Sequence, residues 1–600
     1  MSIGARVRAQ GKSFALGILC LAATNALGLA IPWLIKLSID TLGSRGAAAH
    51  AFVVRSALVI AGFAIVQAFI RTWSRILMFN AGRNVEYELR RDVFAHLTRL
   101  PPSFYRQSPT GDVMSRLTND LGAVRMLFGP GALNIANTAI VYVTGAWLML
   151  TLNPGLTALA LLPFPALILG GRAFSRAIYR TSRDLQDQLG TMSTSIQEDL
   201  AGIAVVKLYA IEDQRQAAFA RLNDDYLSKA LALVRTRGTL MPLFAVVGGM
   251  GTLIVLWAGG RDVIAGRMTV GELVAFNFYL IYMSWPTVAL GWILSLWQRG
   301  VAAWFRVREI LATVPDIADP APGAASRIPI ITNPAVTVRD LTVSYGERTI
   351  LDGVSLDLPA GQTLAIVGRT ASGKTTLVDA IARLIEIPRG TVLVGGHDVV
   401  DLPLAVLRGT VGYAPQEAFL FSATVAENIA FGWRDGGDAG GRDHGDGNRD
   451  GDLDQRARVE RAALAAGLGR DIDVLPEGYD TMVGERGITL SGGQRQRVAL
   501  ARALCAEPRV LLLDDSLSSV DAQTEREILA RLRPILAGRT AVLVSHRVAA
   551  VKDADQIVVL DAGRIVERGR HPDLVAAGGL YAALYREQLA EEALHAEAAS

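Results

Sequence analysis

The chain has few cysteines, little net charge and few ionisable residues inside its apolar stretches. Its 600 residues include two cysteines, Cys20 and Cys505, which lie in dissimilar surroundings. Two isolated thiols exclude a disulfide framework and a cysteine-ligated metal cluster, and such usage suits a protein that faces the cytosol. The formal net charge of +3 is close to neutral for this length, so the composition predicts no nucleic-acid partner.

What the chain has in excess is apolar residues, with 51% hydrophobic positions and a mean hydropathy of +0.31. The excess lies in the first half, where several stretches approach or exceed the ~20 residues that a helix needs to cross hydrocarbon. We predict six membrane-spanning helices, at Ser13–Leu37, Ala51–Ile70, Met126–Leu152, Gly155–Gly171, Thr239–Gly260 and Leu273–Gln298. The last four contain no Asp, Glu, Lys or Arg, which argues against a proton-relay carrier.

Basic residues indicate the orientation of these spans. Arginines and lysines precede the first span and follow the second and the fourth, whereas the links at 38–50, 153–154 and 261–272 are short and less basic. Because positive charge stays on the cytoplasmic side, both termini are predicted to be cytoplasmic. The first apolar run is too long for a cleaved signal peptide and is interpreted as an uncleaved anchor. We therefore expect a multi-pass protein of the plasma or inner membrane, with the lipid bilayer as a partner.

Two long polar segments, Arg71–Arg125 and Arg172–Gly238, separate pairs of spans on the predicted cytoplasmic side. Their helical periodicity predicts helices that leave the membrane and return. The turns between outgoing and returning helices are expected near Phe104–Asp112 and Ala210–Gln216. These polar tips are interpreted as docking surfaces rather than as solvated corners.

Composition changes again after the last span. Residues 1–311 are predicted to form the transmembrane domain, and the proline- and alanine-rich residues 312–336 form a linker. Short β-rich runs then alternate with helices over 337–590, which predicts an α/β domain, and residues 591–600 form a tail. Within that domain, residues 434–453 are rich in glycine and aspartate and cannot bury a core, so they are predicted to be a flexible insertion.

One stretch of the α/β region, Gly368–Thr376, fits the phosphate-binding pattern G-x-x-x-x-G-K-[ST]. Its members are Gly368, Arg369, Thr370, Ala371, Ser372, Gly373, Lys374, Thr375 and Thr376. A predicted strand, Thr363–Val367, enters it and a predicted helix leaves it, so bound phosphates would lie at a helix N-terminus. In this pattern the glycines let backbone amides surround the phosphates, the lysine reaches the β- and γ-phosphates, and the threonine hydroxyl holds Mg²⁺.

Two further motifs accompany this P-loop. Val510–Asp514 is an apolar run that ends in a carboxylate, the Walker B pattern, in which a buried strand delivers an aspartate that organises Mg²⁺. Leu490–Gln494 reads Leu-Ser-Gly-Gly-Gln and opens a predicted helix, which makes a second anion-binding helix end. If the two ends lie apart on the surface, one chain cannot aim both at a single γ-phosphate.

Taken in chain order, these motifs carry a family resemblance. Gly368–Thr376, Gln416, Leu490–Gln494, Asp514 and His546 together resemble the nucleotide-binding domain of ABC transporters. Behind six spans, nearly all 600 residues look like a half-transporter of the exporter type, the class of multidrug and lipid flippases. The resemblance implies an all-α six-helix transmembrane domain of the ABC exporter type followed by an α/β P-loop NTPase domain. It implies ATP-driven export or flipping of a hydrophobic or amphipathic small molecule or lipid by alternating access.

The resemblance also implies a site shared between two halves. ATP would lie between one half's P-loop and the Ser491, Gly492, Gly493 and Gln494 of the other half. Tyr345 would stack on adenine, Gln416 would sense Mg²⁺, His546 would reach the γ-phosphate, and Ser518–Asp521 would form the D-loop across the dimer. The implied Mg²⁺ ligands are Thr375, Gln416 and Asp514, and the implied catalytic residues are Lys374, Gln416, Asp515 and His546.

The chain departs from the family after Walker B, where Asp515 stands in place of the usual glutamate. Aspartate is shorter by one methylene, roughly 1.5 Å of reach. A misplacement of about 1 Å can cost on the order of 100-fold in rate. We therefore favour a degenerate site in a heterodimer, whose partner half keeps its glutamate. A homodimer in which Asp515 is the catalytic base is the alternative.

Three other function classes share some of these features. A soluble ATPase of the chromosome-maintenance or DNA-repair type has the same motifs, but the apolar spans argue against it. For a carrier or channel with a regulatory ATP domain, the sparse ionisable residues of the spans argue against a proton relay, and gating by ATP stays an alternative. An importer built on the exporter fold differs only in direction and stays an alternative.

Overall fold

The computed structural model describes residues 3–42, 47–320, 331–433, 449–484 and 490–599. It divides into a helical unit, residues 1–98 with 109–313, and an α/β unit, residues 99–108 with 314–600. The predicted linker and the predicted insertion therefore lie partly outside the described residues, at 321–330 and 434–448. Inside the range predicted as an insertion, helix α18 (Arg449–Ala465) begins.

The helical unit consists of helices joined by short links. In chain order they are α1 (Ile3–Ala9), α2 (Gly11–Leu42), α3 (Ala47–Leu97), α5 (Thr110–Ser115), η1 (Arg116–Asp120), α6 (Leu121–Met126), η2 (Leu127–Gly131), α7 (Ala132–Leu152), α8 (Pro154–Leu161), α9 (Phe164–Ala201), α10 (Ile203–Leu208), α11 (Glu212–Gly238), α12 (Leu240–Ile254), η3 (Val255–Gly259), α13 (Gly260–Ile264) and α14 (Val270–Ala312).

Four helices of the described part are long and apolar enough to cross a membrane: Gly11–Leu42, Ala48–Leu97, Thr110–Leu152 and Val270–Ala312. They contain the first, second, third and sixth predicted spans. The predicted fourth span is divided between α8 and α9, because Pro163 and Pro165 interrupt helical hydrogen bonding where the chain turns. The predicted fifth span falls on α12 and the π-helical turn η3.

Polar side chains inside this unit bond across helices instead of facing hydrocarbon. Asn25 on α2 donates from Nδ2 to Oδ1 of Asn137 on α7 at 3.1 Å, and its own Oδ1 accepts from the Tyr282 hydroxyl of α14 at 2.9 Å. An unsatisfied amide in hydrocarbon would cost several kcal/mol, so such bonds fix how the helices pack. The apolar core around them includes Val141, Phe276 and other side chains of α7 and α14.

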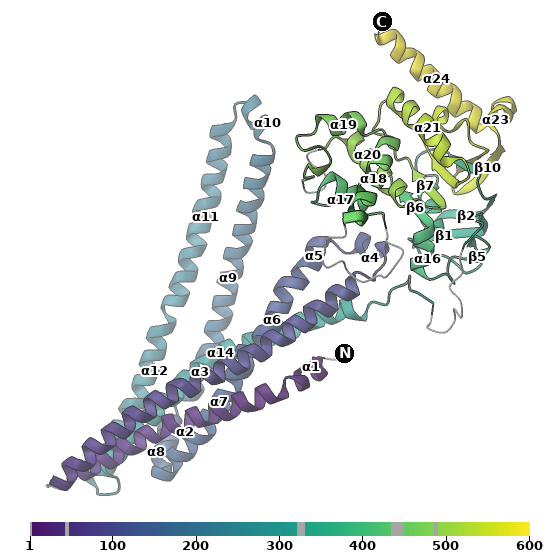
Figure 1. Cartoon of the computed structure of the whole chain (residues 1–600). Coiled ribbons are helices and arrows are strands. Elements are labelled where there is room, and N and C mark those ends of the chain that lie inside the picture. Colours follow the sequence, from purple (N-terminus) through teal and green to yellow (C-terminus); the bar gives the residue numbers. More distant parts are fainter. Residues whose placement is uncertain (1–2, 43–46, 321–330, 434–448, 485–489, 600) are drawn as a thin grey trace. The chain divides into compact units, whose positions relative to one another are not determined.

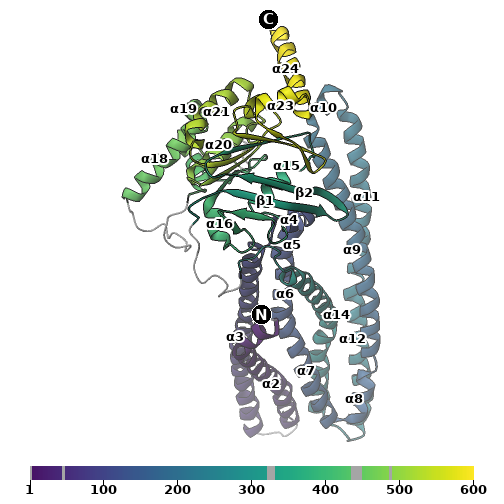
Figure 2. The same ribbon diagram turned by 90° about the vertical axis from the view of Figure 1, so that its right-hand side faces the viewer.

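Helices α9 and α11 form a long hairpin that extends away from the rest of the helical unit (Figures 1 and 2). Gln188 of α9 joins the two helices, donating to the Leu222 carbonyl at 3.0 Å and accepting from Lys229 Nζ at 2.7 Å. The tip lies at Gly202–Ile211, around α10, somewhat earlier than the predicted turn at Ala210–Gln216. The reason is Gly202, which ends α9. The first predicted turn, Phe104–Asp112, covers the end of α4 (Pro102–Gln107), the break at residues 108–109 and the start of α5. Helix α4 belongs to the α/β unit.

The α/β unit contains two sheets and the helices that cover them. Its strands are β1 (Val336–Tyr345), β2 (Arg348–Leu358), β3 (Thr363–Val367), β4 (Val392–Val394), β5 (His397–Asp398), β6 (Val411–Ala414), β7 (Val510–Asp514), β8 (Thr540–Val544), β9 (Gln556–Asp561) and β10 (Arg564–Gly569). Its other elements are α15 (Lys374–Ile381), α16 (Leu404–Thr410), α17 (Val425–Ala430), α18, α19 (Gly469–Val474), η4 (Gly478–Asp480), α20 (Gly492–Cys505), α21 (Ala522–Leu536), α22 (Val548–Val551), α23 (His571–Ala577) and α24 (Leu580–Ala599).

The larger sheet has the order β10-β9-β3-β8-β7-β6, in which β9, β3, β8, β7 and β6 run parallel. The smaller antiparallel sheet has the order β2-β1-β4-β5. Central strands bury both faces: Leu364 and Ile366 face a core shared with the small sheet, while Ala365 and Val367 face a core under α20 and α21. Figure 2 shows the small sheet and these helices on opposite sides of the large sheet. Burial on both faces explains why these strands are continuous apolar runs.

Candidate active site

The predicted site residues follow neighbouring strands of the large sheet. The P-loop follows β3, Asp514 ends β7, His546 lies just after β8, and Gln416 lies just after β6. Because these strands are parallel, their carboxyl ends meet at one edge, which is where ligands bind in open α/β sheets. The strand order places β8 between β3 and β7.

Two glycines give the P-loop its shape. A Cβ on Gly368 would lie 2.1 Å from the Leu560 carbonyl oxygen, so a larger residue would have to displace the backbone of β9. Gly373 has a φ of +102°, and a Cβ there would lie 2.7 Å from the Leu351 side chain. The loop is therefore a tight backbone cradle whose shape depends on glycine, as a phosphate-binding loop requires.

Lys374 is folded back into this loop. Its side chain is buried, and Nζ donates to the carbonyls of Gly368 at 2.9 Å and Arg369 at 2.8 Å. Burial lowers the pKa of the Lys374 ammonium, and the charges of Asp515 and Asp514 act in the opposite direction. The lysine thus holds the loop while keeping its charge close to both carboxylates.

Asp514 is a buried carboxylate that lies near the charge of Lys374 but is not hydrogen-bonded to it. It is 1% exposed, and neither carboxylate oxygen has a hydrogen-bond partner in the described structure. Burial raises its pKa to about 6, with the nearby hydroxyl of Thr375 acting against the shift. An orphaned buried carboxylate beside a hydroxyl fits a divalent cation, because oxygen ligands are what Mg²⁺ prefers. The buried Ser372 hydroxyl, also without a partner, is a further group that fits a polar ligand.

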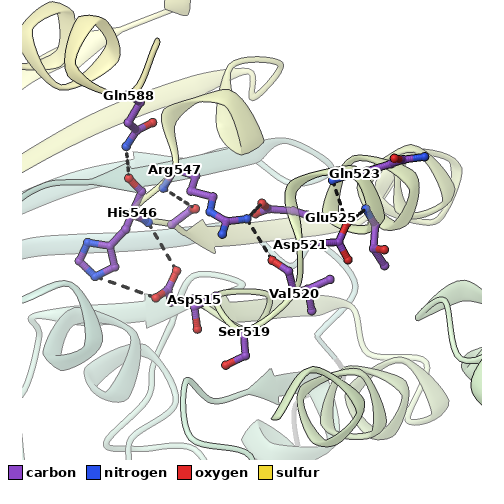
Figure 3. Close-up of polar contacts among 12 residues, drawn as sticks. Asp515, Ser519, Val520, Asp521, Gln523, Glu525, His546, Arg547 and Gln588 are labelled. Carbon is purple, nitrogen blue, oxygen red and sulfur yellow. Dashed lines mark hydrogen bonds and ion pairs between the residues drawn. The ribbon is translucent and has the colours of Figure 1, made fainter. Parts of the chain in front are cut away.

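Asp515, which follows Asp514 in the chain, faces His546 (Figure 3). Asp515 Oδ2 is 4.0 Å from His546 Nε2, and its Oδ1 accepts the His546 backbone N–H at 3.5 Å. Burial lowers the pKa of the His546 imidazole, as does the charge of Lys374. Asp515 has a φ of +45°, so its backbone turns sharply after the strand. The carboxylate and the imidazole are therefore placed at the same edge as the P-loop lysine.

The predicted second anion-binding end is the start of α20, and it is capped by its own side chains. Ser491 Oγ accepts the Gln494 N–H at 3.2 Å, and Gln494 Oε1 accepts the Ser491 N–H at 2.8 Å. Gly493 lies against the D-loop, since a Cβ there would be 3.1 Å from the Ser519 carbonyl oxygen. Ser491–Gln494 thus contacts the D-loop and Asp471 of α19, and it is held by elements other than those that hold the P-loop.

Sequence reasoning missed Gln496, which connects three of the predicted motifs. This buried side chain donates from Nε2 to Ser518 Oγ at 2.9 Å and to the Gln416 carbonyl at 3.3 Å. Its Oε1 accepts the Ser519 N–H at 2.8 Å. Gln496 therefore fixes the start of α20 against the D-loop and the Gln416 segment. Gln416 itself is exposed, and this contact is through its backbone.

The predicted adenine-stacking residue, Tyr345, ends β1 and is half exposed. The guanidinium of Arg106, just inside α4, lies 5.5 Å from the centre of its ring, within cation–π range. Arg106 is also close enough to Asp379 of α15 to act against the burial that raises the pKa of that carboxyl. Asp379 in turn accepts the Tyr413 hydroxyl at 3.2 Å. None of Arg106, Asp379 and Tyr413 was predicted as a site residue: Tyr413 entered the sequence argument only as a neighbour of Gln416, and the other two carry no motif.

Comparisons with known proteins agree with this arrangement. The profile of the ABC transporter transmembrane region matches residues 14–287, and the ABC transporter profile matches residues 351–518. The chain is 34% identical over 535 residues to the multidrug resistance-like ATP-binding protein MdlA of Escherichia coli (strain K12), covering 88% of this chain and 87% of that protein. It is 30% identical over 586 residues to an ATP-dependent lipid A-core flippase of Syntrophus aciditrophicus (strain SB), covering 98% and 94%.

A solved structure is similar over the same extent. It is the structure of a bacterial Atm1-family ABC exporter with ATP bound, with a TM-score of 0.77 and 28% identity. The match covers 96% of this chain and 99% of that one. Both the helical unit and the α/β unit thus have counterparts in single known chains.

Proposed function

We propose a function from one premise: the chain belongs to the ABC transporters, as an exporter-type half-transporter whose transmembrane domain is fused to its nucleotide-binding domain. It is an ATPase coupled to transmembrane export, and its helical region followed by an α/β region is the ABC exporter fold. Half-transporters of this kind act as dimers in a membrane. We propose domain limits at 1–311, 312–336 and 337–590.

The observation that carries the nucleotide site is the buried, unpartnered carboxylate of Asp514 beside the P-loop. The residues that would hold Mg²⁺ are Asp514, Thr375 and Gln416, and Mg²⁺ would neutralise charge on the β- and γ-phosphates. The P-loop residues 368–376 would bind the phosphates, and Tyr345 would support the adenine. Because Ser491–Gln494 is held by other elements, we propose that it completes the site of a second half.

The chemistry is attack of water on the γ-phosphate, which needs positioning and charge stabilisation more than covalent help. We propose that Lys374 stabilises charge on the phosphates and that Asp515 orients and polarises the water. His546, 4.0 Å from Asp515, would hold the γ-phosphate end of the site. Gln416, whose carbonyl is tied to Gln496, would report on Mg²⁺ to the rest of the chain.

We further propose that this site hydrolyses ATP slowly and that the working transporter is a heterodimer. Aspartate at 515 is shorter than glutamate by roughly 1.5 Å. The sharp backbone turn at its φ of +45° fixes where the short side chain begins. The alternative is a homodimer in which Asp515, already facing His546, serves as the base.

The substrate is proposed to be hydrophobic or amphipathic, a small molecule or a lipid. The helical unit supports this because two polar side chains that meet between its long apolar helices, Asn25 and Tyr282, are uncharged and bonded to each other. The proposed location is the plasma or inner membrane with both termini and the ATPase domain in the cytoplasm, following the basic residues. Import on the same fold is the competing direction.

The experiment is to reconstitute the purified chain in liposomes and measure ATP hydrolysis and movement of a fluorescent lipid. We expect slow hydrolysis by the native chain and a rise on the order of 10- to 100-fold for Asp515→Glu. Asp515→Asn serves as the control and should abolish the remaining rate. Fast hydrolysis by the native chain that Asp515→Glu leaves unchanged would establish the homodimer and overturn the degenerate site.

A further inference from the structure

The carboxamide of Gln588, on the C-terminal helix α24, bonds both sides of the segment that carries His546. Its Nε2 donates to the His546 carbonyl (Figure 3). Its Oε1 accepts the Val548 N–H at 2.6 Å. A primary amide has one donor end and one acceptor end, and both are used here. Because Val548 begins the short helix α22, its N–H would otherwise lack a helical partner.

The same segment is held from the opposite side by Arg547. Its guanidinium donates to the Val520 carbonyl at 3.1 Å and pairs with the buried carboxylate of Glu525 on α21. Its backbone N–H donates to Ser545 Oγ at 2.9 Å. Residues 545–548, which we call the switch loop, are thus fixed between α24 and the D-loop side of the unit, as Figure 3 shows.

Helix α24 does not depend on Gln588 for its own docking. The N–H groups of Leu580 and Tyr581 are bound by the Glu567 carboxylate, and the buried Tyr581 hydroxyl contacts His571 Nδ1 at 2.7 Å. Leu584 packs against the core of the unit one turn before Gln588. The bonds from Gln588 therefore act on the switch loop rather than on the helix that presents them.

We propose that Gln588 is a positioning residue for hydrolysis: through its two backbone bonds, the C-terminal helix sets where His546 stands relative to Asp515. The proposal rests on the proposed function for the role of His546. It adds that the last helix, α24, determines the position of the switch loop. Fixing the carbonyl of 546 and the N–H of 548 fixes the two peptide planes on either side of Arg547. Without them, the loop would keep the Arg547 contacts and the His546 N–H bond to Asp515. The peptide planes on either side of Arg547 would be less restrained, and the imidazole could rotate away from the phosphate side.

The test compares Gln588→Met, which keeps length but removes both bonds, with Glu587→Met, an exposed neighbour on the same helix. In the full-length reconstituted protein, Gln588→Met should lower kcat by on the order of 10- to 100-fold, since displacement by about 1 Å has that effect. The Kd for ATP should stay within about twofold, because the P-loop is untouched. Gln588→Glu keeps the acceptor for the Val548 N–H, so its kcat should lie between that of Gln588→Met and that of the native chain. Glu587→Met should match the native chain.

Amide hydrogen exchange separates positioning from simple loss of structure. Exchange over residues 545–551 should accelerate in Gln588→Met while residues 580–587 stay protected. Faster exchange over 580–587 with an unchanged switch loop would overturn the proposal, as would an unchanged kcat. A chain lacking residues 591–600 keeps Gln588 and should retain its rate, whereas one lacking 588–600 should show the loss.

His546→Ala distinguishes the two levels of inference. If His546→Ala is inactive and Gln588→Met is fully active, the positioning role is wrong while the proposed site stands. If His546→Ala is fully active, the proposed role of the histidine is itself wrong. In the double variant His546→Ala with Gln588→Met, kcat should equal that of His546→Ala alone, because the glutamine acts through the histidine.

Discussion

Two helix N-termini in the α/β unit are expected to meet phosphate, and they satisfy their polar groups in opposite ways. At α15 the N-cap is Gly373 in a left-handed conformation without a side-chain cap, and Lys374 folds over the loop. At α20 the side chains of Ser491 and Gln494 cap the helix reciprocally. The first end is shaped for a ligand that supplies the missing contacts, whereas the second is stable by itself. This difference is what a site completed by another half requires.

The largest expected effect tests the ligand-shaped end. Lys374→Ala removes a buried ammonium near both aspartates and should lower kcat/KM for ATP by on the order of 100- to 1000-fold. ATP binding measured by a fluorescent analogue should weaken as well. The control is Lys552→Ala, an exposed lysine in the same unit. If kcat/KM fell equally in Lys374→Ala and Lys552→Ala, the start of α15 would have no special role in ATP hydrolysis.

The next prediction is that stability and Mg²⁺ affinity depend on pH through Asp514, which lies beside the P-loop. Because the pKa of Asp514 is raised to about 6, the folded chain without nucleotide holds an extra proton below that pH. Its stability contribution is therefore full at low pH and is lost as the pH rises through about 6. Mg²⁺ must displace this proton, so the apparent affinity for Mg²⁺ with ATP should fall by about fivefold from pH 6 to pH 5.

Thermal unfolding and Mg²⁺ titration at several pH values measure both trends. Asp514→Asn carries no titratable proton there, so its stability should lose the dependence between about pH 4 and pH 6. A native chain whose Mg²⁺ affinity is flat across this range would show that Asp514 is ionised before the metal arrives.

A smaller effect is expected at the self-capped end. Ser491→Ala removes one half of the reciprocal cap and should cost about 1 kcal/mol of stability, as other cap deletions do. If two copies of this chain pair, as in the homodimer alternative, and this end serves the partner's site, mixing Ser491→Ala chains with Lys374→Ala chains should restore one intact site per mixed dimer. Hydrolysis by the mixture above that of either variant alone supports completion in trans, and no gain contradicts it.

The smallest effect concerns the adenine end of the site. Arg106→Ala removes the cation beside Tyr345, and exposed cation–π contacts are worth about 0.5–1 kcal/mol. We expect ATP to bind about twofold to fivefold tighter, because the ring is then free for the base. Arg99→Ala, exposed in the same segment, is the matched control. Weaker binding in Arg106→Ala would instead show that the arginine supports the nucleotide.

Local pattern predicted much of this architecture, and contacts between distant segments explain the rest. The strands predicted at Thr363–Val367 and Val510–Asp514 are β3 and β7 of the structure. They could be predicted because fully buried parallel strands are continuous apolar runs. The second tip was misplaced because Gly202 ended a helix whose periodicity continued beyond it. Gln496 and Gln588 were missed because each reaches backbone far away in sequence, and no spacing rule records such a partner.

The length of the α9–α11 hairpin converts a small tilt at its base into a larger displacement of its tip. Helix α9 has 38 residues, which at the usual helical rise is about 57 Å of nearly rigid rod. A tilt of about 5° at the first residue of this helix would move its last residue by about 5 Å, close to one helical turn. Small rearrangements of packed side chains near the substrate can thus produce displacements at the tip that are large enough to open or close contacts there. Conversely, a displacement of the tip would tilt the helices near the substrate.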